Sequence, residues 1–373
     1  MTTQLRDLQT PCLLLDLDIM ARNIARVQTA AQRLGVGLRP HVKTPKAIEI
    51  GKELGGGIGP ITVSTLSEAD VFASAGFNDI LYATLLSASK VSRVEALLAG
   101  GCRLLSLVDS PVAVAQLAAA RRGARPLPVL IEIDVDGHRA GVRLGDAFDA
   151  LAALLIADSG FTLLGAMSYA GASYDIEPDA RAVLAERHRR ALVAAGQRIA
   201  ALGGQPEILS FGSTPALMAA ATLEGVTEVR GGIFVFQDLF QAGIGACTLD
   251  DIALSVLSTV VGHQPDSKRL WIDAGGMALS KDRSTAGRSF DARYGLVTAA
   301  DGRRLPLWVA DVHQELGLVE SIDGTPIDFG SAPIGGQLRI LPNHSDMTAA
   351  AYDRYHLLRG GQLVGTWARH NGW

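Results

Sequence analysis

The sequence predicts an α/β protein, a (β/α)8 TIM barrel with a second, mostly β domain at its C-terminal end. Through the first two-thirds of the 373 residues, short apolar runs alternate with alanine- and leucine-rich helical stretches. Eight such runs can be counted, which favours a closed barrel of parallel strands over an open doubly wound sheet. After about residue 240 the helical stretches become scarce, and strand-like segments joined by turns replace them.

The expected elements follow in chain order. Barrel strands are expected at 38–41, 61–63, 80–83, 104–108, 129–135, 163–168, 208–211 and 227–236, and the intervening helices at 19–34, 67–75, 87–99, 112–121, 147–157, 180–202 and 216–224. In the second domain, strands are expected at 254–263, 269–272, 305–309, 337–341 and 362–367. The segment 10–15 precedes the first helix, and we expect it to add a strand to the β domain. The predicted division is therefore 1–17, 18–243 and 244–373.

Composition excludes several classes of function. The chain is 48% hydrophobic and 19% charged, with a net charge of −4 and no basic block, which argues against nucleic acid as a partner. It contains no run of about 18 apolar residues that would predict a membrane span, and its start lacks the apolar core of a signal peptide. The three cysteines are far apart and lack metal-ligand spacing, so we expect free thiols and a cytoplasmic location.

The first expected strand leads into a lysine. In the segment Arg39-Pro40-His41-Val42-Lys43, Lys43 stands where a barrel strand ends and its side chain points into the mouth of the barrel. The neighbouring Arg39 and His41 predict a cationic environment, which lowers the pKa of an amine and makes it a nucleophile toward a carbonyl. Alone, a lysine at the start of a helix is more often a surface residue.

Two further strand ends carry candidate site residues. The fifth strand leads into Gly137-His138-Arg139-Ala140-Gly141, a loop that offers a guanidinium between glycines. The sixth ends at Tyr169, which places an aromatic ring at the mouth of the barrel. By themselves, Arg139 is equally consistent with a loop ion pair and Tyr169 with core packing.

The seventh and eighth strands both end in glycine-bearing turns. These turns are Phe211-Gly212-Ser213-Thr214 and Arg230-Gly231-Gly232-Ile233. In TIM barrels the loops after these two strands commonly bind phosphate through backbone N–H groups. A phosphate site, an amine nucleophile and a ring partner together indicate pyridoxal phosphate, bound as a Schiff base at Lys43.

The β domain contains a candidate metal pair. In Pro342-Asn343-His344-Ser345-Asp346, residues i and i+2 of an extended segment share a face, so His344 and Asp346 can reach one ion. Imidazole with carboxylate suits Mn²⁺, Mg²⁺ or Zn²⁺ in a site that keeps positions open for water and substrate.

These segments, in this order, resemble the alanine-racemase-like (fold type III) pyridoxal-phosphate enzymes, and more narrowly the D-threonine aldolase and D-serine dehydratase family. The resemblance runs from Thr10 to Asp346, and its most specific pieces are 39–43, 137–141 and 342–346. It implies a homodimer that acts on a small D-amino acid. It also implies roles for the candidate residues: Lys43 as the Schiff-base lysine, Arg139 facing the pyridine nitrogen, Tyr169 beside the ring, Ser213, Thr214, Gly232 and Ile233 binding phosphate, and His344 and Asp346 holding the divalent cation.

Some positions depart from the family pattern. Pro45, Ala172 and Leu316 stand where members commonly carry histidines, and Phe211 replaces a glycine of the phosphate turn. Loss of these polar groups removes a proton carrier or a partner of a metal ligand, which affects the choice of substrate more than cofactor binding.

The resemblance leaves the reaction open among several alternatives. In this family the metal pair is His with Asp in the aldolases and His with Cys in the dehydratases, so Asp346 favours retro-aldol cleavage of a D-β-hydroxy-α-amino acid such as D-threonine to glycine and an aldehyde. His41 and a metal-bound water are the candidates for the base. The alternative is a D-serine or D-threonine dehydratase that forms a 2-oxo acid and ammonia. A racemase and a non-catalytic carrier of pyridoxal phosphate are less consistent with the metal pair.

Overall fold

The computed structural model describes residues 4–137, 139–288 and 290–373, and the chain forms two compact units. We call residues 25–232 the barrel unit, and the segments up to Ile24 and from Ile233 to Asn371 the β unit. The chain thus divides at 24/25 and 232/233, several residues away from the expected boundaries at 17/18 and 243/244. Each unit is described by itself.

The strands of the barrel unit are parallel. Within the described residues its sheet has the order β2-β9-β8-β7-β6-β5-β4-β3, with bounds β2 Gly37–Leu38, β3 Ile61–Val63, β4 Asp79–Leu85, β5 Arg103–Val108, β6 Leu127–Ile133, β7 Phe161–Tyr169, β8 Ile208–Gly212 and β9 Glu228–Arg230. All eight expected strands are present, which confirms the predicted barrel class. The eighth is shorter than the expected 227–236, because the chain turns at Gly231-Gly232 and enters a 3₁₀ turn, Ile233–Val235.

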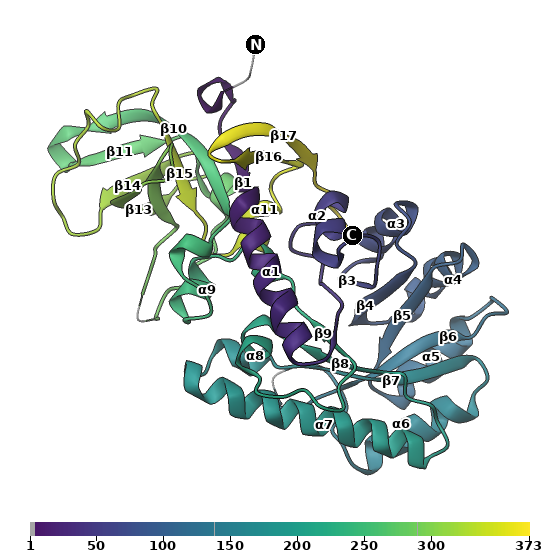
Figure 1. Ribbon diagram of the computed structural model, residues 1–373. Helices are drawn as coiled ribbons and strands as arrows, with labels where there is room; N and C mark the ends of the chain where they lie inside the picture. The colour runs from purple at the N-terminus through teal and green to yellow at the C-terminus, as the bar shows by residue number, and fades with distance from the viewer. Residues whose placement is uncertain (1–3, 138, 289) are drawn as a thin grey trace. The chain divides into compact units, whose positions relative to one another are not determined.

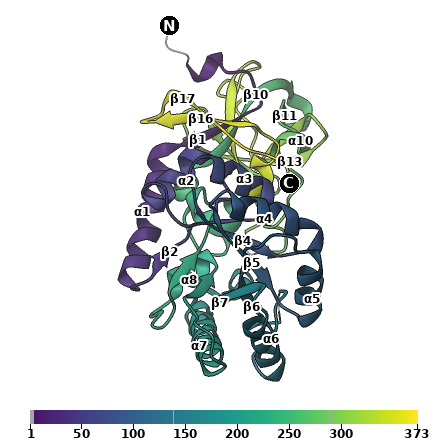
Figure 2. The same cartoon turned by 90° about the vertical axis from the view of Figure 1, so that its right-hand side faces the viewer.

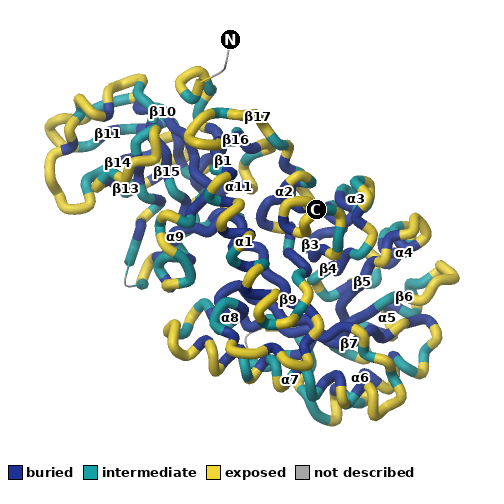
Figure 3. The backbone as a smooth tube through the Cα atoms, viewed as in Figure 1, coloured by how far each residue is buried: buried dark blue, intermediate teal, exposed yellow. Residues whose placement is uncertain are grey.

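Helices follow the strands and lie outside them (Figures 1 and 2). Their bounds are α1 Leu17–Arg33, α2 Ile48–Gly55, α3 Leu66–Ser74, α4 Val91–Ala99, α5 Pro111–Ala120, α6 Asp146–Ala157, α7 Arg181–Ala201 and α8 Thr214–Ala219; α1 begins in the β unit. Local sequence sets several of their ends. Thr65 caps α3 by accepting from the backbone N–H of Glu68, and Ser110 caps α5 just before a proline at its first position. Burial alternates along the helices, whereas the strands are mostly buried (Figure 3).

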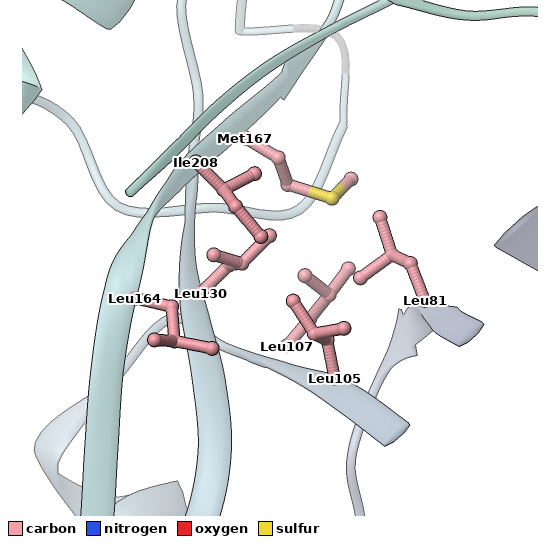
Figure 4. Close-up of a cluster of buried hydrophobic side chains, with 7 residues drawn as sticks. All are labelled: Leu81, Leu105, Leu107, Leu130, Leu164, Met167 and Ile208. Atoms are coloured by element: carbon pink, nitrogen blue, oxygen red, sulfur yellow. The ribbon is translucent and has the colours of Figure 1, made fainter. Parts of the chain in front are cut away.

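Leucines fill the interior of the barrel. Side chains from five neighbouring strands converge there (Figure 4), namely Leu81 of β4, Leu105 and Leu107 of β5, Leu130 of β6, Leu164 and Met167 of β7, and Ile208 of β8. Burying each such side chain contributes about 1.5–3 kcal/mol. The barrel is therefore packed through its centre, and ligands are expected at its end.

The first strand closes the barrel. On one side β2 pairs with β9, and on the other a parallel bridge joins His41 to Thr62 of β3. Thr62 donates to the carbonyl of Pro40 (2.8 Å) and accepts from Val42 (2.9 Å). This closure fixes the segment that ends at Lys43 at the carboxyl end of the strands.

The β unit is built on a mixed, mainly antiparallel sheet. Within the described residues its order is β11-β14-β13-β12-β15-β10-β1-β16-β17, with bounds β1 Cys12–Asp16, β10 Leu254–Gln264, β11 Arg269–Ile272, β12 Leu296–Ala299, β13 Arg304–Val312, β14 Gly317–Ser321, β15 Gln337–Leu341, β16 Arg354–Arg359 and β17 Gln362–Ala368. Its short helices are α9 Leu239–Gly243, α10 Gly276–Leu279 and α11 Ser345–Ala349. The N-terminal strand β1 pairs antiparallel with β10 and parallel with β16.

Candidate active site

Arg39, four residues before Lys43 in the chain, has a structural role. It is 3% exposed, its Nε lies 2.8 Å from a carboxylate oxygen of Glu228 and its Nη1 lies 2.7 Å from Asp79. These contacts join β2 to β9 and β4. The charge of Arg39 is therefore balanced by two carboxylates, and the cationic neighbourhood expected from it has another source.

Two arginines from distant strand ends supply that neighbourhood. Burial, together with the positive charges of Lys43, Arg230 and Arg139, lowers the pKa of His41 well below its ordinary value. The imidazole is therefore neutral near pH 7, and its Nε2 lies 2.9 Å from Ser64 Oγ. The three cations disfavour a proton on this imidazole, and they attract an anionic cofactor or substrate.

Arg139 and Tyr169 are brought together as a pair. The Arg139 guanidinium lies 4.5 Å from the centre of the Tyr169 ring, and the Tyr169 hydroxyl lies 3.2 Å from that of Tyr174. The loop that carries Arg139 returns to the sheet at Gly141, where φ is +132° and a Cβ would lie 2.7 Å from the backbone nitrogen of Asp134. A glycine is required there. His138 of the same loop lies outside the described residues.

The turn after β8 carries two hydroxyls. Ser213 has a φ of +112° and caps α8, and its Oγ lies 2.6 Å from Ser173 Oγ. Thr214 is 3% exposed, and its Oγ1 is buried without a hydrogen-bond partner in the described part of the chain. A buried hydroxyl in this state fits a ligand oxygen.

The turn after β9 meets the lysine segment. His41 donates its backbone N–H to the carbonyl of Gly231 (2.8 Å). A Cβ on Gly232 would lie 2.5 Å from the carbonyl of His41 and 3.2 Å from Thr44 Oγ1, a second buried hydroxyl without a partner among the described residues. Ile233, the next residue, is buried and begins the β unit. Glycine backbone and an orphaned hydroxyl thus lie beside the segment that carries Lys43, and they fit a phosphorylated cofactor.

Two charged residues here escaped the sequence analysis. Arg230, 3% exposed, donates from Nε to Ser210 Oγ (2.8 Å) and from Nη2 to the carbonyl of Ser168 (2.6 Å), and burial lowers its pKa to about 10. Burial raises the pKa of Glu132 to about 7, although Arg230 and Arg139 oppose that shift. For Glu132 the available signal was a charged residue inside an otherwise apolar strand, since such residues are seldom buried without a partner.

The β unit holds the candidate metal pair. His344 immediately precedes α11, and Asp346 lies in the first turn of that helix. The expected extended segment is therefore wrong for Asp346, because the chain turns into a helix at Ser345. The described residues contain no group of three or more His, Cys, Asp or Glu side chains arranged to hold a metal. Any ion here would draw two protein ligands from the predicted pair.

A buried carboxylate orients the histidine. Asp238 is fully buried; its Oδ2 lies 3.2 Å from Nδ1 of His344 and accepts from the backbone N–H of Ser345 (3.1 Å). Burial alone would lower the pKa of His344, but the hydrogen bond to Asp238 and the nearby carboxylates outweigh it and raise the pKa to about 9. Because Nδ1 is engaged, Nε2 is the nitrogen that can face an ion, which would displace the proton from it; this arrangement is common to metal-binding histidines.

The chain is similar to known proteins along most of its length. Residues 15–239 match the model of the alanine racemase N-terminal domain, and residues 253–358 match a putative serine dehydratase domain. D-threo-3-hydroxyaspartate dehydratase of Delftia sp. (strain HT23) is 44% identical, with all of both chains covered. Among the described residues, no helix is both long and apolar enough to cross a membrane.

Solved structures extend the comparison to two reaction types. A cysteine-to-alanine mutant of D-threo-3-hydroxyaspartate dehydratase in the metal-free form has a TM-score of 0.95 and 42% identity, with 100% of both chains covered. D-threonine aldolase from Filomicrobium marinum has a TM-score of 0.81 and 26% identity, over 98% of this chain and 96% of that one. The whole chain, rather than one domain, is shared with these enzymes.

Proposed function

Because this chain belongs to the alanine-racemase-like, pyridoxal-phosphate-dependent family of D-amino-acid lyases, we propose that it is a dehydratase of D-3-hydroxy amino acids. The reaction removes the α-proton and the β-hydroxyl of the substrate as water. Hydrolysis of the remaining imine then gives a 2-oxo acid and ammonia. Identity of 44% over the full length to D-threo-3-hydroxyaspartate dehydratase favours elimination over the aldol cleavage expected from Asp346.

The observation that carries the proposal is the convergence of Lys43, His41, Arg139 and Arg230 at one end of the barrel. Pyridoxal phosphate bound there supplies an electron sink for the charge that develops at Cα. Lys43 would hold the aldehyde of the cofactor, and the Arg139–Tyr169 pair would border its ring. Thr214, Ser213 and the backbone at Gly232 and Ile233 would bind its phosphate.

The charges at this site indicate which residues would transfer protons. Lys43 would take the α-proton of the substrate, and His41 beside it would stay neutral because burial and the neighbouring cations lower its pKa. Arg139 at the ring nitrogen would disfavour protonation of that nitrogen, because adjacent cations repel.

A divalent cation, Mn²⁺, Mg²⁺ or Zn²⁺, would be held by His344 and Asp346, with Asp238 fixing the imidazole. It would supply a Lewis acid that helps the β-hydroxyl leave. The metal-free form of a cysteine mutant of the dehydratase relative supports a metal in this family. Here an aspartate occupies the second ligand position, a harder donor than cysteine.

That aspartate also favours a second candidate function, retro-aldol cleavage to glycine and an aldehyde. The likeness to D-threonine aldolase over nearly the whole chain supports it. The homodimer implied by the resemblance and the cytoplasmic location expected from the composition remain predictions; light scattering of purified protein measures the first.

The experiment is a product analysis. Purified protein with pyridoxal phosphate and Mn²⁺ or Zn²⁺ is incubated with D-threo-3-hydroxyaspartate, D-serine or D-threonine. A 2-oxo acid with equimolar ammonia supports the dehydratase, whereas glycine with an aldehyde contradicts it in favour of the aldolase. The L-isomer as the product would indicate a racemase, and cofactor binding without turnover of any substrate would indicate a carrier.

Two variants test whether Lys43 is the lysine that holds the cofactor. Lys43→Ala should abolish both the cofactor absorbance and the products. Lys52→Ala changes an exposed lysine on α2 and serves as the matched control. Activity that survives Lys43→Ala would overturn the assignment of the cofactor lysine.

A further inference from the structure

A cavity lies wholly among residues of the β unit and is lined by none of the site residues above. Its volume is about 340 Å³, within the range of small-molecule sites. It is lined by three cationic and three anionic side chains: Arg22, Arg304, Arg339, Asp16, Asp250 and Asp301. Hydroxyls of Ser255 and Thr298 and a set of aliphatic side chains complete its wall.

Among these charged groups, Arg339 has a buried N–H group that lacks a hydrogen-bond partner in the described part of the chain. It lies in β15, where its neighbours across the sheet are Leu257 of β10 and Thr298 of β12. The residue is 8% exposed, and its Nε is buried without a hydrogen-bond partner among the described residues. A buried guanidinium N–H that lacks a partner costs free energy, and a ligand oxygen in the cavity would remove that cost.

Two of the carboxylates near Arg339 use only one oxygen each in hydrogen bonds within the protein. Oδ1 of Asp16 accepts from the backbone of Asp18 and Ile19 at the start of α1, and Oδ1 of Asp301 accepts from Arg303. In the described part of the chain no hydrogen bond reaches Oδ2 of either. Both carboxylates act electrostatically on Arg339 and oppose the lowering of its pKa by burial.

Arg22, the third cation of the lining, is exposed on α1. Arg304 pairs with Asp250, so the lining provides one buried, incompletely bonded cation with carboxylates beside it. A simple anion would be repelled by these carboxylates, and a simple cation by the arginines. A molecule that carries both charges a short distance apart satisfies both sets.

The apolar part of the lining indicates the rest of the ligand. Ile19, Leu249, Ile252, Leu341 and Leu358 contribute aliphatic surface. We propose that this cavity binds a free α-amino acid with an aliphatic side chain, its carboxylate at Arg339 and its ammonium group at Asp16 and Asp301. The site is separate from the one that would bind the substrate.

Calorimetric titration of the cofactor-loaded protein tests this with three matched probes. L-leucine carries both charges, 4-methylpentanoate lacks the ammonium group, and 3-methylbutylamine lacks the carboxylate. Saturable binding is expected for L-leucine. Each analogue should bind at least about tenfold more weakly, because one charged hydrogen-bond set is lost.

Variants of the lining residues test whether L-leucine binds in this cavity. The double change Asp16→Asn with Asp301→Asn keeps an N-cap residue before α1 and the Oδ1 acceptor of the turn, yet removes both negative charges. It should weaken L-leucine about tenfold, to the affinity of 4-methylpentanoate. Arg339→Met should abolish binding of both, whereas Arg354→Met, at an exposed arginine of β16, is the control.

Lys43→Ala separates this cavity from the cofactor site. Binding of L-leucine that persists in Lys43→Ala, weakens about tenfold in the aspartate double variant and is lost in Arg339→Met supports the proposal. Binding that is lost in Lys43→Ala but kept in the double variant would assign leucine to the cofactor site and overturn it. Absence of saturable binding by all three probes to the unmodified protein would also overturn it.

Discussion

Nε2 of His188, on α7, lies 2.7 Å from a carboxylate oxygen of Asp136, and both side chains are almost completely buried. Asp136 stands three residues before Arg139, in the loop after β6. The ring of His188 also packs edge-on against Phe211 of β8. This pair therefore connects the arginine loop to a helix outside the barrel, and it ties the position of Arg139 to the charge state of one histidine.

The pair predicts a pH dependence of stability. Burial lowers the pKa of His188 in the folded protein, and the contact with Asp136 only partly opposes that shift. The unfolded chain, with an ordinary histidine pKa of about 6.5, then binds more protons than the folded one just below that pH. The contribution of His188 to the free energy of unfolding should be complete above about pH 6.5 and be lost as the pH falls toward the lower folded pKa.

Urea unfolding at pH 5.5 and 8 measures this. In His188→Gln, whose side chain cannot titrate, the free energy of unfolding should differ less between pH 5.5 and pH 8 than in the unmodified protein. In His313→Gln, a change at an exposed position, this difference should stay as in the unmodified protein. An unchanged pH difference in His188→Gln would contradict the assignment.

A second prediction concerns the ion pairs at Arg39. Arg39→Met leaves the carboxylates of Glu228 and Asp79 without their cation, and removing one partner of a buried pair costs about 3–5 kcal/mol. The free energy of unfolding should fall by that amount. Arg190→Met breaks an exposed pair with Glu186 on α7 and should cost less than about 1 kcal/mol. Equal effects of the two changes would refute a structural role for Arg39.

The barrel strands could be predicted from the sequence because most are apolar runs that are largely buried, such as β5, β6 and β8, and recognisable helices separate them. Strands β12, β14 and β16 were missed: all are short, and turns or a helix separate them from their partners. In the site, Lys43 and the glycine turns have local signals. Arg230 does not, because its partners Ser168 and Ser210 come from other strands.

Asp238, in the β unit, is another site residue that the sequence alone does not reveal. It lies 106 residues before His344 in the chain, so that no local spacing reveals the contact. Only the fold brings the two together, whereas His344 and Asp346 are visible as a short motif. Contacts across long loops are in general the part of a site that a single sequence leaves undetermined.

A third prediction tests the turn after β9. Gly232→Ala places a Cβ 2.5 Å from the carbonyl of His41, closer than real contacts allow, so that the lysine segment must shift. The affinity for pyridoxal phosphate, measured from its absorbance on titration, should fall at least about tenfold. Gly59→Ala, where a Cβ would meet no atom within 4 Å, is the control. An unchanged affinity in Gly232→Ala would mean that this turn does not border the cofactor.

The last prediction concerns Asp238. Asp238→Asn retains an N-cap for α9, since asparagine also accepts from the backbone N–H of Gln241. It removes the charge that orients His344, and changes of such a residue typically weaken metal binding about 10–100-fold. Titration with Mn²⁺, followed by electron paramagnetic resonance of the free ion, measures the loss. Asp353→Asn, an exposed carboxylate in the β unit, should bind Mn²⁺ like the unmodified protein. If Asp238→Asn binds Mn²⁺ as tightly as that control, His344 is not held for a metal by Asp238.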